Sequence, residues 1–338
     1  MEKDHLLQVK GLCTHFPTEK GRVTAVSHVS FHIDKGEVLG IVGESGCGKS
    51  VTAESIMRLL NEKGGVFYEG EILYEGENLL QMSEDEMRNI RGNKISMIFQ
   101  DPMSSLNPVY TVGNQIIEGL VNHQKLSKKN AYQKAVEMLK LTGIPSPEKR
   151  VHQYPHELSG GMRQRAMIAL ALACRPTLLI ADEPTTALDV TTQAQILEVL
   201  EDLKNELNMA TIMITHDLGV VAEVCSRVIV MYLGQVIEEA EVEELFDRPL
   251  HPYTRGLLRS IPQLDGDREQ KLHVIEGMVP TLHDVPTGCR FVARCKYADE
   301  QCHQEEPVFS FVTEQHAVRC WHYEKIEKQE ADHSEAPH

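Results

Sequence analysis

A glycine-rich segment of eight residues constrains this chain more than any other feature of its sequence. Residues 43–50 read Gly-Glu-Ser-Gly-Cys-Gly-Lys-Ser and fit the pattern G-x-x-x-x-G-K-[ST]. A short apolar run at 37–43 leads into the segment, and a helix is predicted to follow from about Gly48 to Asn61. This order of strand, loop and helix predicts a loop that wraps around a phosphate group within an α/β core.

Each residue type in the segment has a physical role in such a loop. Gly46 and Gly48 let the backbone curl without Cβ clashes, so that N–H groups and the helix dipole face negative charge. We expect Lys49 to reach the β- and γ-phosphates and Ser50 to ligate Mg²⁺. Cys47 is interpreted as a small loop residue that is open to oxidation. The nucleotide-binding residues predicted here are Gly43, Glu44, Ser45, Gly46, Cys47, Gly48, Lys49, Ser50 and Val51.

Two carboxylates follow a buried strand further along the chain. The strand residues 178–181 are Leu-Leu-Ile-Ala, and Asp182, Glu183 and Pro184 come directly after them. In open α/β sheets, ligands bind at the carboxyl ends of the strands. Asp182 is therefore predicted to hold Mg²⁺ through its water shell, and Glu183 to orient and polarise an attacking water. With Lys49 these groups suffice for hydrolysis, because phosphoryl transfer needs mainly positioning and charge neutralisation.

The remaining sequence fits an α/β architecture with a largely parallel sheet. The 338 residues accommodate one large domain with a smaller appendage. Residues 111–143 have helical periodicity, with Ser127 as an N-cap, and interrupt the alternation of strands and helices. Strands are predicted at 6–12, 24–33, 70–74, 95–99, 177–181 and 211–215, a hairpin at 228–238, and helices at 159–174 and, capped by Asp189, up to about 207.

Composition excludes several classes of function. With a formal net charge of −16, the chain lacks the excess of basic residues that non-specific nucleic-acid binding requires. The longest apolar run, 166–174, is far shorter than the roughly 20 residues of a membrane span. The charged N-terminus, Met1-Glu-Lys-Asp-His5, is not followed by the apolar core of a signal peptide. We therefore expect a cytosolic protein whose association with any membrane is peripheral.

Residues further along the chain resemble a known family. Leu158-Ser-Gly-Gly-Met162 resembles the signature motif of ATP-binding cassette (ABC) ATPases. Gln100, in Phe-Gln-Asp-Pro, is similar to the Q-loop of that family, and residues 187–189, Ala-Leu-Asp, to its D-loop. His216, in Ile-Thr-His-Asp, is similar to the switch histidine, and Phe16 lies where the family places an aromatic ring that stacks on adenine.

The resemblance covers residues 6 to about 245 and implies a fold and an activity. The fold implied is the P-loop NTPase fold of an ABC nucleotide-binding domain, with a helical subdomain at about 103–157. The activity implied is ATP hydrolysis coupled to transport. The domain boundaries that follow are an ABC domain at 1–249, a Cys-rich extension at 250–323 and a disordered tail at 324–338.

The signature segment has a physical reading beside the resemblance. Ser159 begins a predicted helix, so its hydroxyl and the N–H groups of Gly160 and Gly161 offer a second anion site. In the family, Ser159 of one subunit caps the γ-phosphate that Lys49 holds in the other subunit of a head-to-tail dimer. The resemblance further implies Glu183, His216 and Gln100 as catalytic residues, Ser50, Gln100 and Asp182 as Mg²⁺ ligands, and Asp189 as a nucleotide contact.

The region after residue 250 resembles one particular group within this family. His251-Pro-Tyr-Thr-Arg-Gly-Leu-Leu-Arg-Ser260, with the segments 40–46 and 101–108, resembles the D-type ATPase subunits of bacterial oligopeptide and dipeptide importers. The implied partners are two transmembrane permease subunits, a second ATPase subunit that is usually an unlike chain, and, indirectly, an extracytoplasmic solute-binding protein. The implied location is the cytoplasmic face of the inner membrane. Nickel and glutathione importers share these features, so the cargo stays open.

Four cysteines cluster near the C-terminus. Their spacing, C-x5-C-x6-C-x17-C, differs from the C-x2–4-C start of most structural zinc sites, and four thiolates can also hold a [4Fe–4S] cluster. The resemblance to peptide importers implies the iron–sulfur cluster, while zinc, a disulfide and unligated thiols stay open. The ligands predicted for the cluster are Cys289, Cys295, Cys302 and Cys320.

Three other classes of protein fit the sequence less well. Soluble ABC ATPases of DNA repair or chromosome maintenance carry long coiled coils between the phosphate loop and the signature, whereas Lys49 and Ser159 are only 110 residues apart here. ABC factors that act on ribosomes carry two cassettes in one chain, and this chain has one. A P-loop kinase or GTPase leaves the signature and His216 unexplained.

Overall fold

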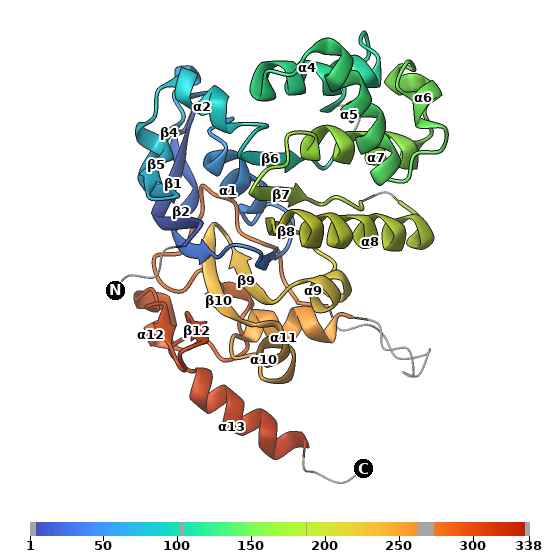
Figure 1. The fold of residues 1–338 in the computed structure, drawn as a ribbon. Helices are drawn as coiled ribbons and strands as arrows, with labels where there is room; N and C mark the ends of the chain where they lie inside the picture. The colour runs from blue at the N-terminus through green and yellow to red at the C-terminus, as the bar shows by residue number, and fades with distance from the viewer. Residues whose placement is uncertain (1–4, 102–104, 187, 262–273, 335–338) are drawn as a thin grey trace. The chain divides into compact units, whose positions relative to one another are not determined.

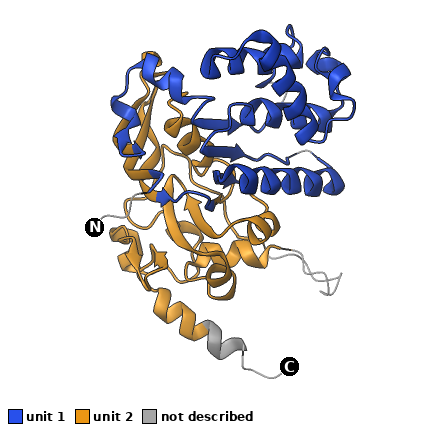
Figure 2. Cartoon of the chain, viewed as in Figure 1, with its two compact units in different colours: residues 1–7, 32–38, 73–214 blue, residues 8–31, 39–72, 215–338 orange. Residues whose placement is uncertain are grey.

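The computed structural model describes residues 5–101, 105–186, 188–261 and 274–334 (Figure 1). The chain divides into two compact units, each built from several segments of sequence (Figure 2). Unit 1 comprises residues 1–7, 32–38 and 73–214, and unit 2 comprises 8–31, 39–72 and 215–338. None of the helices in the described residues combines the length and the apolar character needed to cross a bilayer.

Unit 1 contains a set of parallel strands. Strand β7 (Leu178–Asp182) pairs in parallel with β6 (Ile95–Ile98) and with β8 (Ala210–Ile214). Every residue of the three strands is buried, which is why their sequences are continuous apolar runs rather than alternating ones. The prediction of buried parallel strands is confirmed, and Asp182 forms the carboxyl end of β7.

The helical insertion of unit 1 also follows its sequence signals. Ser127 caps α5 by accepting a hydrogen bond from the Asn130 N–H, and Asp189 caps α8 by accepting one from the Thr192 N–H. The sequence predicted both caps. The helices of this unit are α2 (Glu84–Ile90), α4 (Val112–Gln124), α5 (Lys128–Leu141), α6 (Pro147–Arg150), α7 (Gly160–Leu172) and α8 (Val190–Leu207), with 3-10 turns η2 (Leu79–Gln81) and η3 (Pro155–Glu157) and the short strand β5 (Glu77–Asn78).

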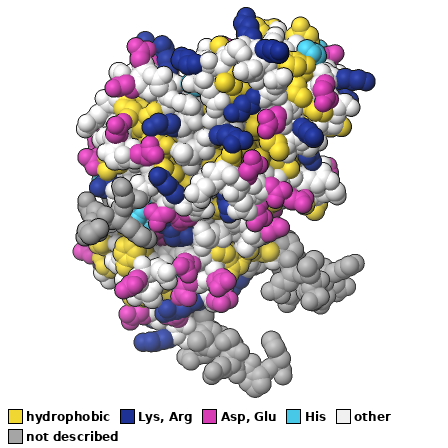
Figure 3. Space-filling view, viewed as in Figure 1, with side chains coloured by type: hydrophobic (Ala, Val, Ile, Leu, Met, Phe, Trp, Pro, Cys, Tyr) yellow, Lys and Arg dark blue, Asp and Glu magenta, His cyan; other side chains and the backbone are white. Residues whose placement is uncertain are grey.

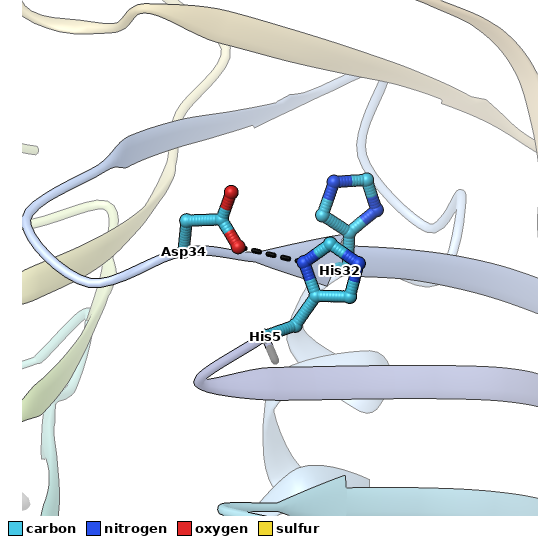
Figure 4. Close-up of side chains that lie close together, drawn as sticks. All are labelled: His5, His32 and Asp34. Carbon is cyan, nitrogen blue, oxygen red and sulfur yellow. Dashed lines mark hydrogen bonds and ion pairs between the residues drawn. The ribbon is translucent and has the colours of Figure 1, made fainter. Parts of the chain in front are cut away.

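The first described residue, His5, is fixed to the segment that follows β2 (Gly21–Ile33). Its Nδ1 lies 2.6 Å from Oδ1 of Asp34, and its ring lies 4.0 Å, centroid to centroid, from that of His32 (Figure 4). The N–H of Leu6 donates to the carbonyl of Ile33. These contacts hold the start of the chain in unit 1.

Unit 2 contains the hairpin that the sequence predicted around Leu233 and Gly234. Its strands, β9 (Arg227–Tyr232) and β10 (Gln235–Glu241), are antiparallel, and β9 pairs in parallel with β3 (Val38–Val42). On the other side, β10 pairs with β12 (His316–Val318), and β12 with β11 (Ser310–Phe311), both antiparallel. The C-terminal extension therefore continues the same sheet as the strand that precedes the phosphate loop.

A second sheet has the order β2-β1-β4, with β1 at Leu7–Thr18 and β4 at Phe67–Tyr74. The helices of unit 2 are α1 (Lys49–Ile56), α9 (Leu218–Val224), α10 (Val242–Asp247), α11 (Pro252–Arg259), α12 (Glu300–Gln304) and α13 (Tyr323–Ser334), with 3-10 turns η1 (Glu62–Gly64) and η4 (Val292–Arg294).

Two sequence predictions need correction. Helix α1 ends at Ile56 rather than Asn61, because Arg58 has a φ of +48° and the Asn61 side chain instead caps η1. The tail 324–338 was predicted to be disordered, but α13 continues to Ser334. Ile326 is buried and Arg248 forms a double ion pair with Glu327, so tertiary contacts order a segment whose composition alone is too polar to fold. Residues 335–338 lie outside the described part, as do residues 102–104 and 187 and the stretch 262–273.

A fully buried pair fastens the extension to the hairpin. Oε1 of Glu238 lies 2.9 Å from Nε2 of His316, and both side chains are 0% exposed. The Glu238 carboxylate also accepts hydrogen bonds from the backbone N–H groups of Leu250 and His251. One carboxylate on β10 therefore holds both β12 and the start of α11.

We expect Glu238→Ala to lower the free energy of unfolding by about 3–5 kcal/mol, because the substitution removes the acceptor of three buried donors. Chemical denaturation followed by circular dichroism measures the loss. Glu84→Ala is the matched control, because Glu84 pairs with Arg91 at the surface and its removal should cost about 1 kcal/mol or less. Equal losses for the two variants would contradict the anchoring role of Glu238.

Candidate functional site

The phosphate loop of unit 2 has a backbone that requires glycine. Gly43, Gly46 and Gly48 have φ values of +150°, +79° and +102°. A Cβ at Gly43 would lie 2.3 Å from the carbonyl oxygen of Met231, and one at Gly48 would lie 2.8 Å from that of Ala25. Gly46, in contrast, has open space where a Cβ would be. The loop is therefore packed closely against β9 and β2 at both of its ends and is open in the middle.

Lys49 begins α1 directly after this loop, with Gly48 as the N-cap. Its ammonium group donates hydrogen bonds to the carbonyls of Gly43, at 2.7 Å, and Glu44, at 3.1 Å. The lysine side chain thus folds back over the loop and brings a positive charge to the start of a helix. This is the arrangement that favours a bound phosphate.

Two further loop residues differ in exposure. Ser50 is exposed, whereas Cys47 is buried. Burial raises the pKa of the Cys47 thiol, which disfavours the thiolate, the form that oxidants attack. The Cys47 carbonyl accepts a hydrogen bond from the Gly234 N–H at 2.8 Å, which ties the loop to the hairpin.

A second group of site residues lies in unit 1. Nε2 of Gln100 donates a hydrogen bond to Oε2 of Glu183 at 2.8 Å, and the hydroxyl of Thr186 donates to the same oxygen at 2.8 Å. Glu183 is half-buried and has a φ of +48°, a conformation that a non-glycine residue adopts rarely. Two donors therefore fix a carboxylate on a strained backbone, directly after Asp182, which is 5% exposed.

The structure brings Gln100 and Glu183 together, which sequence reasoning had not specified. Thr186 was missed as well, although a hydroxyl three residues after the acid in Glu-Pro-Thr-Thr was a usable signal. Gln164, on α7, is another missed residue: its side chain donates to the carbonyl of Pro184 and so supports the turn that carries Glu183.

The signature segment forms the exposed start of α7. Ser159 is its N-cap, and the Ser159 hydroxyl accepts a hydrogen bond from the N–H of Met162 at 3.4 Å. Gly160 has nothing within 4 Å of a Cβ position, so its backbone is accessible. The predicted cap is confirmed, and the accessible N–H groups at a helix start are the physical basis for the predicted anion site.

The other predicted nucleotide contacts are spread over both units. His216 follows β8 and is exposed in unit 2, where Asp217 caps α9. Asp189 in unit 1 is exposed, and hydrogen bonds from Thr192 lower its pKa, so its carboxylate serves first as a helix cap. Phe16 is half-buried on β1. The roles of these residues toward a nucleotide stay predictions.

The four C-terminal cysteines line one small cavity in unit 2. Its volume is about 10 Å³, close to the space that one water needs. Burial raises the pKa of Cys289 to about 11 and that of Cys320 to about 12, and it also raises the pKa of Cys295 and Cys302. The rest of the wall is mixed: His251, Tyr297 and His322 line it together with the apolar side chains of Pro252, Phe291, Val292, Pro307, Trp321 and Ile326.

Comparison with known proteins gives matches over nearly the whole chain. Residues 26–186 match the family described as "ABC transporter", and residues 237–302 match "Oligopeptide/dipeptide transporter, C-terminal region". The oligopeptide transport ATP-binding protein OppD of Bacillus subtilis is 55% identical over 94% of this chain and 88% of its own. The dipeptide transport ATP-binding protein DppD of the same organism is 50% identical over 99% of this chain and 98% of its own.

A solved structure is also similar. It is the dimeric post-hydrolysis state of the ATP-binding cassette MJ0796 bound to ADP and Pi, with a TM-score of 0.63 and 29% identity. The similarity covers 70% of this chain and 98% of that chain.

Gly43→Ala is expected to weaken ATP binding at least about tenfold, because a Cβ there meets the Met231 carbonyl and forces the loop to move. Titration with a fluorescent ATP analogue measures the change. Gly119→Ala on α4 is the control: nothing lies within 4 Å of that Cβ position, and the substitution suits a helix. Unchanged affinity in Gly43→Ala would show that the close approach at Gly43 does not shape the site.

Proposed function

The chain belongs to the family of ABC transporter ATP-binding proteins that end in the oligopeptide/dipeptide transporter C-terminal region, and from this premise we propose that it hydrolyses ATP to power the uptake of di- or oligopeptides. The observation that carries the proposal is the identity of 50–55% to oligopeptide and dipeptide transport ATP-binding proteins over almost the entire length. Nickel or glutathione as cargo is the alternative.

The residues described above have distinct roles in this reaction. The N–H groups of residues 43–50 and the Lys49 ammonium bind the phosphates, and the residues that would hold Mg²⁺ are Ser50, Asp182 and Gln100. Magnesium, when bound, neutralises charge on the transferring phosphoryl group. Glu183 takes the proton of the attacking water, and the hydrogen bonds from Gln100 and Thr186 keep its carboxylate in one orientation.

The partners follow from the same proposal. A second ATPase subunit, an unlike chain, completes the nucleotide site of this one: its signature segment caps the γ-phosphate bound to Lys49 of this chain, and Ser159 of this chain caps the γ-phosphate bound in the partner's phosphate loop. Closure of the pair is favoured by ATP because ATP binds the closed state better than the open one. An extracytoplasmic solute-binding protein delivers the cargo indirectly.

Two transmembrane permease subunits are the partners that convert closure into transport. Val109 is 71% exposed and Tyr110 is 54% exposed, just after the Gln100 segment and at the start of the helical block of unit 1. Exposed apolar side chains of this size favour a protein contact. We place the protein at the cytoplasmic face of the membrane, held there by its permeases. Figure 3 shows both acidic and basic side chains on the one face that it draws.

The four cysteines, we propose, hold a [4Fe–4S] cluster with a structural role. The donor set supports this, since four thiols line one cavity and a cluster is held by thiolates; the cavity of about 10 Å³ would have to widen to hold the irons and sulfides. Burial favours the neutral form of these thiols, and a bound metal would favour the thiolates by offsetting their charge. Zinc held by the same thiols is the alternative.

Glu183→Gln should bind ATP with little change but hydrolyse it between about 100-fold and 10,000-fold more slowly, because the amide cannot accept the proton of water. ATP binding and phosphate release are measured on the purified complex, and uptake of labelled peptides, nickel and glutathione in cells. Glu148→Gln, an exposed change on α6, is the control. Hydrolysis at the wild-type rate in Glu183→Gln would refute the role of Glu183, and uptake of nickel alone would refute the peptide cargo.

Cys295→Ser should abolish bound iron, acid-labile sulfide and the visible absorbance of protein that was purified without oxygen, since it removes one of four ligands. Cys174→Ser is the matched control, because Cys174 is a buried thiol of unit 1 outside the cavity. Parent protein that contains zinc in place of iron, or neither metal, would contradict the cluster.

A further inference from the structure

The side chain of one loop residue, Glu44, is held by the C-terminal extension. Nη1 and Nη2 of Arg294 donate to the two carboxylate oxygens of Glu44, at 2.6 Å and 3.0 Å. The Arg294 side chain is only 3% exposed, and it also donates hydrogen bonds to the carbonyls of Ile275 and Glu276. Such a bidentate, charge-assisted pair is both strong and directional, so the arginine fixes the position of the Glu44 side chain.

The backbone of Glu44 is held by the same extension. Its N–H donates to the hydroxyl oxygen of Tyr253 on α11 at 2.8 Å. Tyr253 is completely buried, and its ring packs edge-on against Tyr232 and Phe291, with centroids 4.9 Å and 5.5 Å away. Because these rings fix the hydroxyl, the acceptor of the Glu44 N–H cannot move without repacking the core.

Arg294, which binds Glu44, is adjacent in sequence to Cys295, one of the four cysteines that line the cavity. The segment 289–295 begins with Cys289, whose N–H donates to the carbonyl of Cys302, and ends with Arg294 and Cys295. Two of the four thiols and the arginine are therefore parts of one seven-residue segment.

A second connection runs from the same segment to the loop. Arg290 donates to the carbonyl of Leu233 and to the hydroxyl of Ser27, at 2.9 Å for the latter. The next residue of that hairpin, Gly234, donates its N–H to the Cys47 carbonyl in the loop at 2.8 Å. The segment 289–295 thus contacts the phosphate loop in two ways. Arg294 binds Glu44 directly, and Arg290 is linked through the hairpin to Cys47.

We propose that Arg294 is a positioning residue for the phosphate loop, and that the segment 289–295 couples the state of the four-cysteine cavity to nucleotide affinity. The first part stands on the Arg294–Glu44 pair alone, whereas the second rests on the proposed metal centre. A shift of the segment on loading or emptying the cavity moves Arg294, and with it the loop. Because such coupling is reciprocal, nucleotide binding also favours the loaded cavity.

The positioning role is tested with Arg294→Met, Arg294→Lys and Glu44→Gln in the full-length chain. Arg294→Met should raise the Kd for a fluorescent ATP analogue by about tenfold to a hundredfold, which is the usual range for a lost hydrogen-bonded charge pair. Arg294→Lys keeps the charge without the bidentate geometry, so its Kd for the ATP analogue should lie between those of Arg294→Met and the parent. The double variant with Arg294→Met and Glu44→Gln should bind the ATP analogue at least as tightly as Arg294→Met alone.

The control is Arg248→Met, which breaks a comparable double ion pair, to Glu327 on α13, without touching the loop. It should leave the Kd for the ATP analogue within about twofold of the parent, and thermal melting shows whether each variant is folded. A Kd unchanged in folded Arg294→Met, or raised equally in Arg248→Met, would overturn the positioning role.

The coupling is tested by a double-mutant cycle. Cys295→Ser should weaken binding of the ATP analogue in the parent chain and have little further effect in Arg294→Met, because both changes act through one contact. The reciprocal readout is iron retention under a chelator, which saturating ATP should prolong in the parent and not in Arg294→Met. Additive effects on Kd would overturn the coupling. Parent protein without metal would overturn the coupling and the proposed cluster, while the Arg294→Met result would still decide the positioning role.

Discussion

The close approach of the loop backbone to its neighbours is the constraint on which the nucleotide half-site of unit 2 depends. At Gly43 and Gly48 the chain passes so near the carbonyls of Met231 and Ala25 that any side chain would collide. The same passages set the positive φ values that turn the chain into α1 and orient the N–H groups of the loop. Lys49 can cover the loop only because the backbone before it has this shape.

The carboxylate of Glu183 illustrates a different use of strain. Its φ of +48° is unfavourable for a side chain of this type, and it occurs directly after a strand whose residues are all buried. The hydrogen bonds from Gln100 and Thr186 then leave the Glu183 side chain little freedom. A carboxylate that is fixed in advance loses little entropy when it engages water, which suits a reaction that depends mainly on positioning.

The C-terminal extension is part of the same compact unit as the phosphate loop. Its strand β12 continues the sheet of β10, and the buried pair of Glu238 and His316 joins them. Tyr253 and Arg294 reach Glu44 across 209 and 250 residues of sequence. Because the extension contacts Glu44 in this way, a change in the extension can alter the affinity of the loop for nucleotide, whatever occupies the four-cysteine cavity.

The sequence by itself determined the features that depend on local order. The glycine pattern specified the loop, continuous apolar runs specified β7 and β8, and Ser127, Ser159 and Asp189 marked helix starts, because each signal acts within a few residues. Only the tertiary structure decided that Arg294 and Tyr253 hold Glu44, that Thr186 shares an oxygen of Glu183 with Gln100, and that α13 is ordered by Ile326. Those contacts join segments that are distant or individually polar, and their energy comes from burial and charge pairing that exist only once the chain has folded.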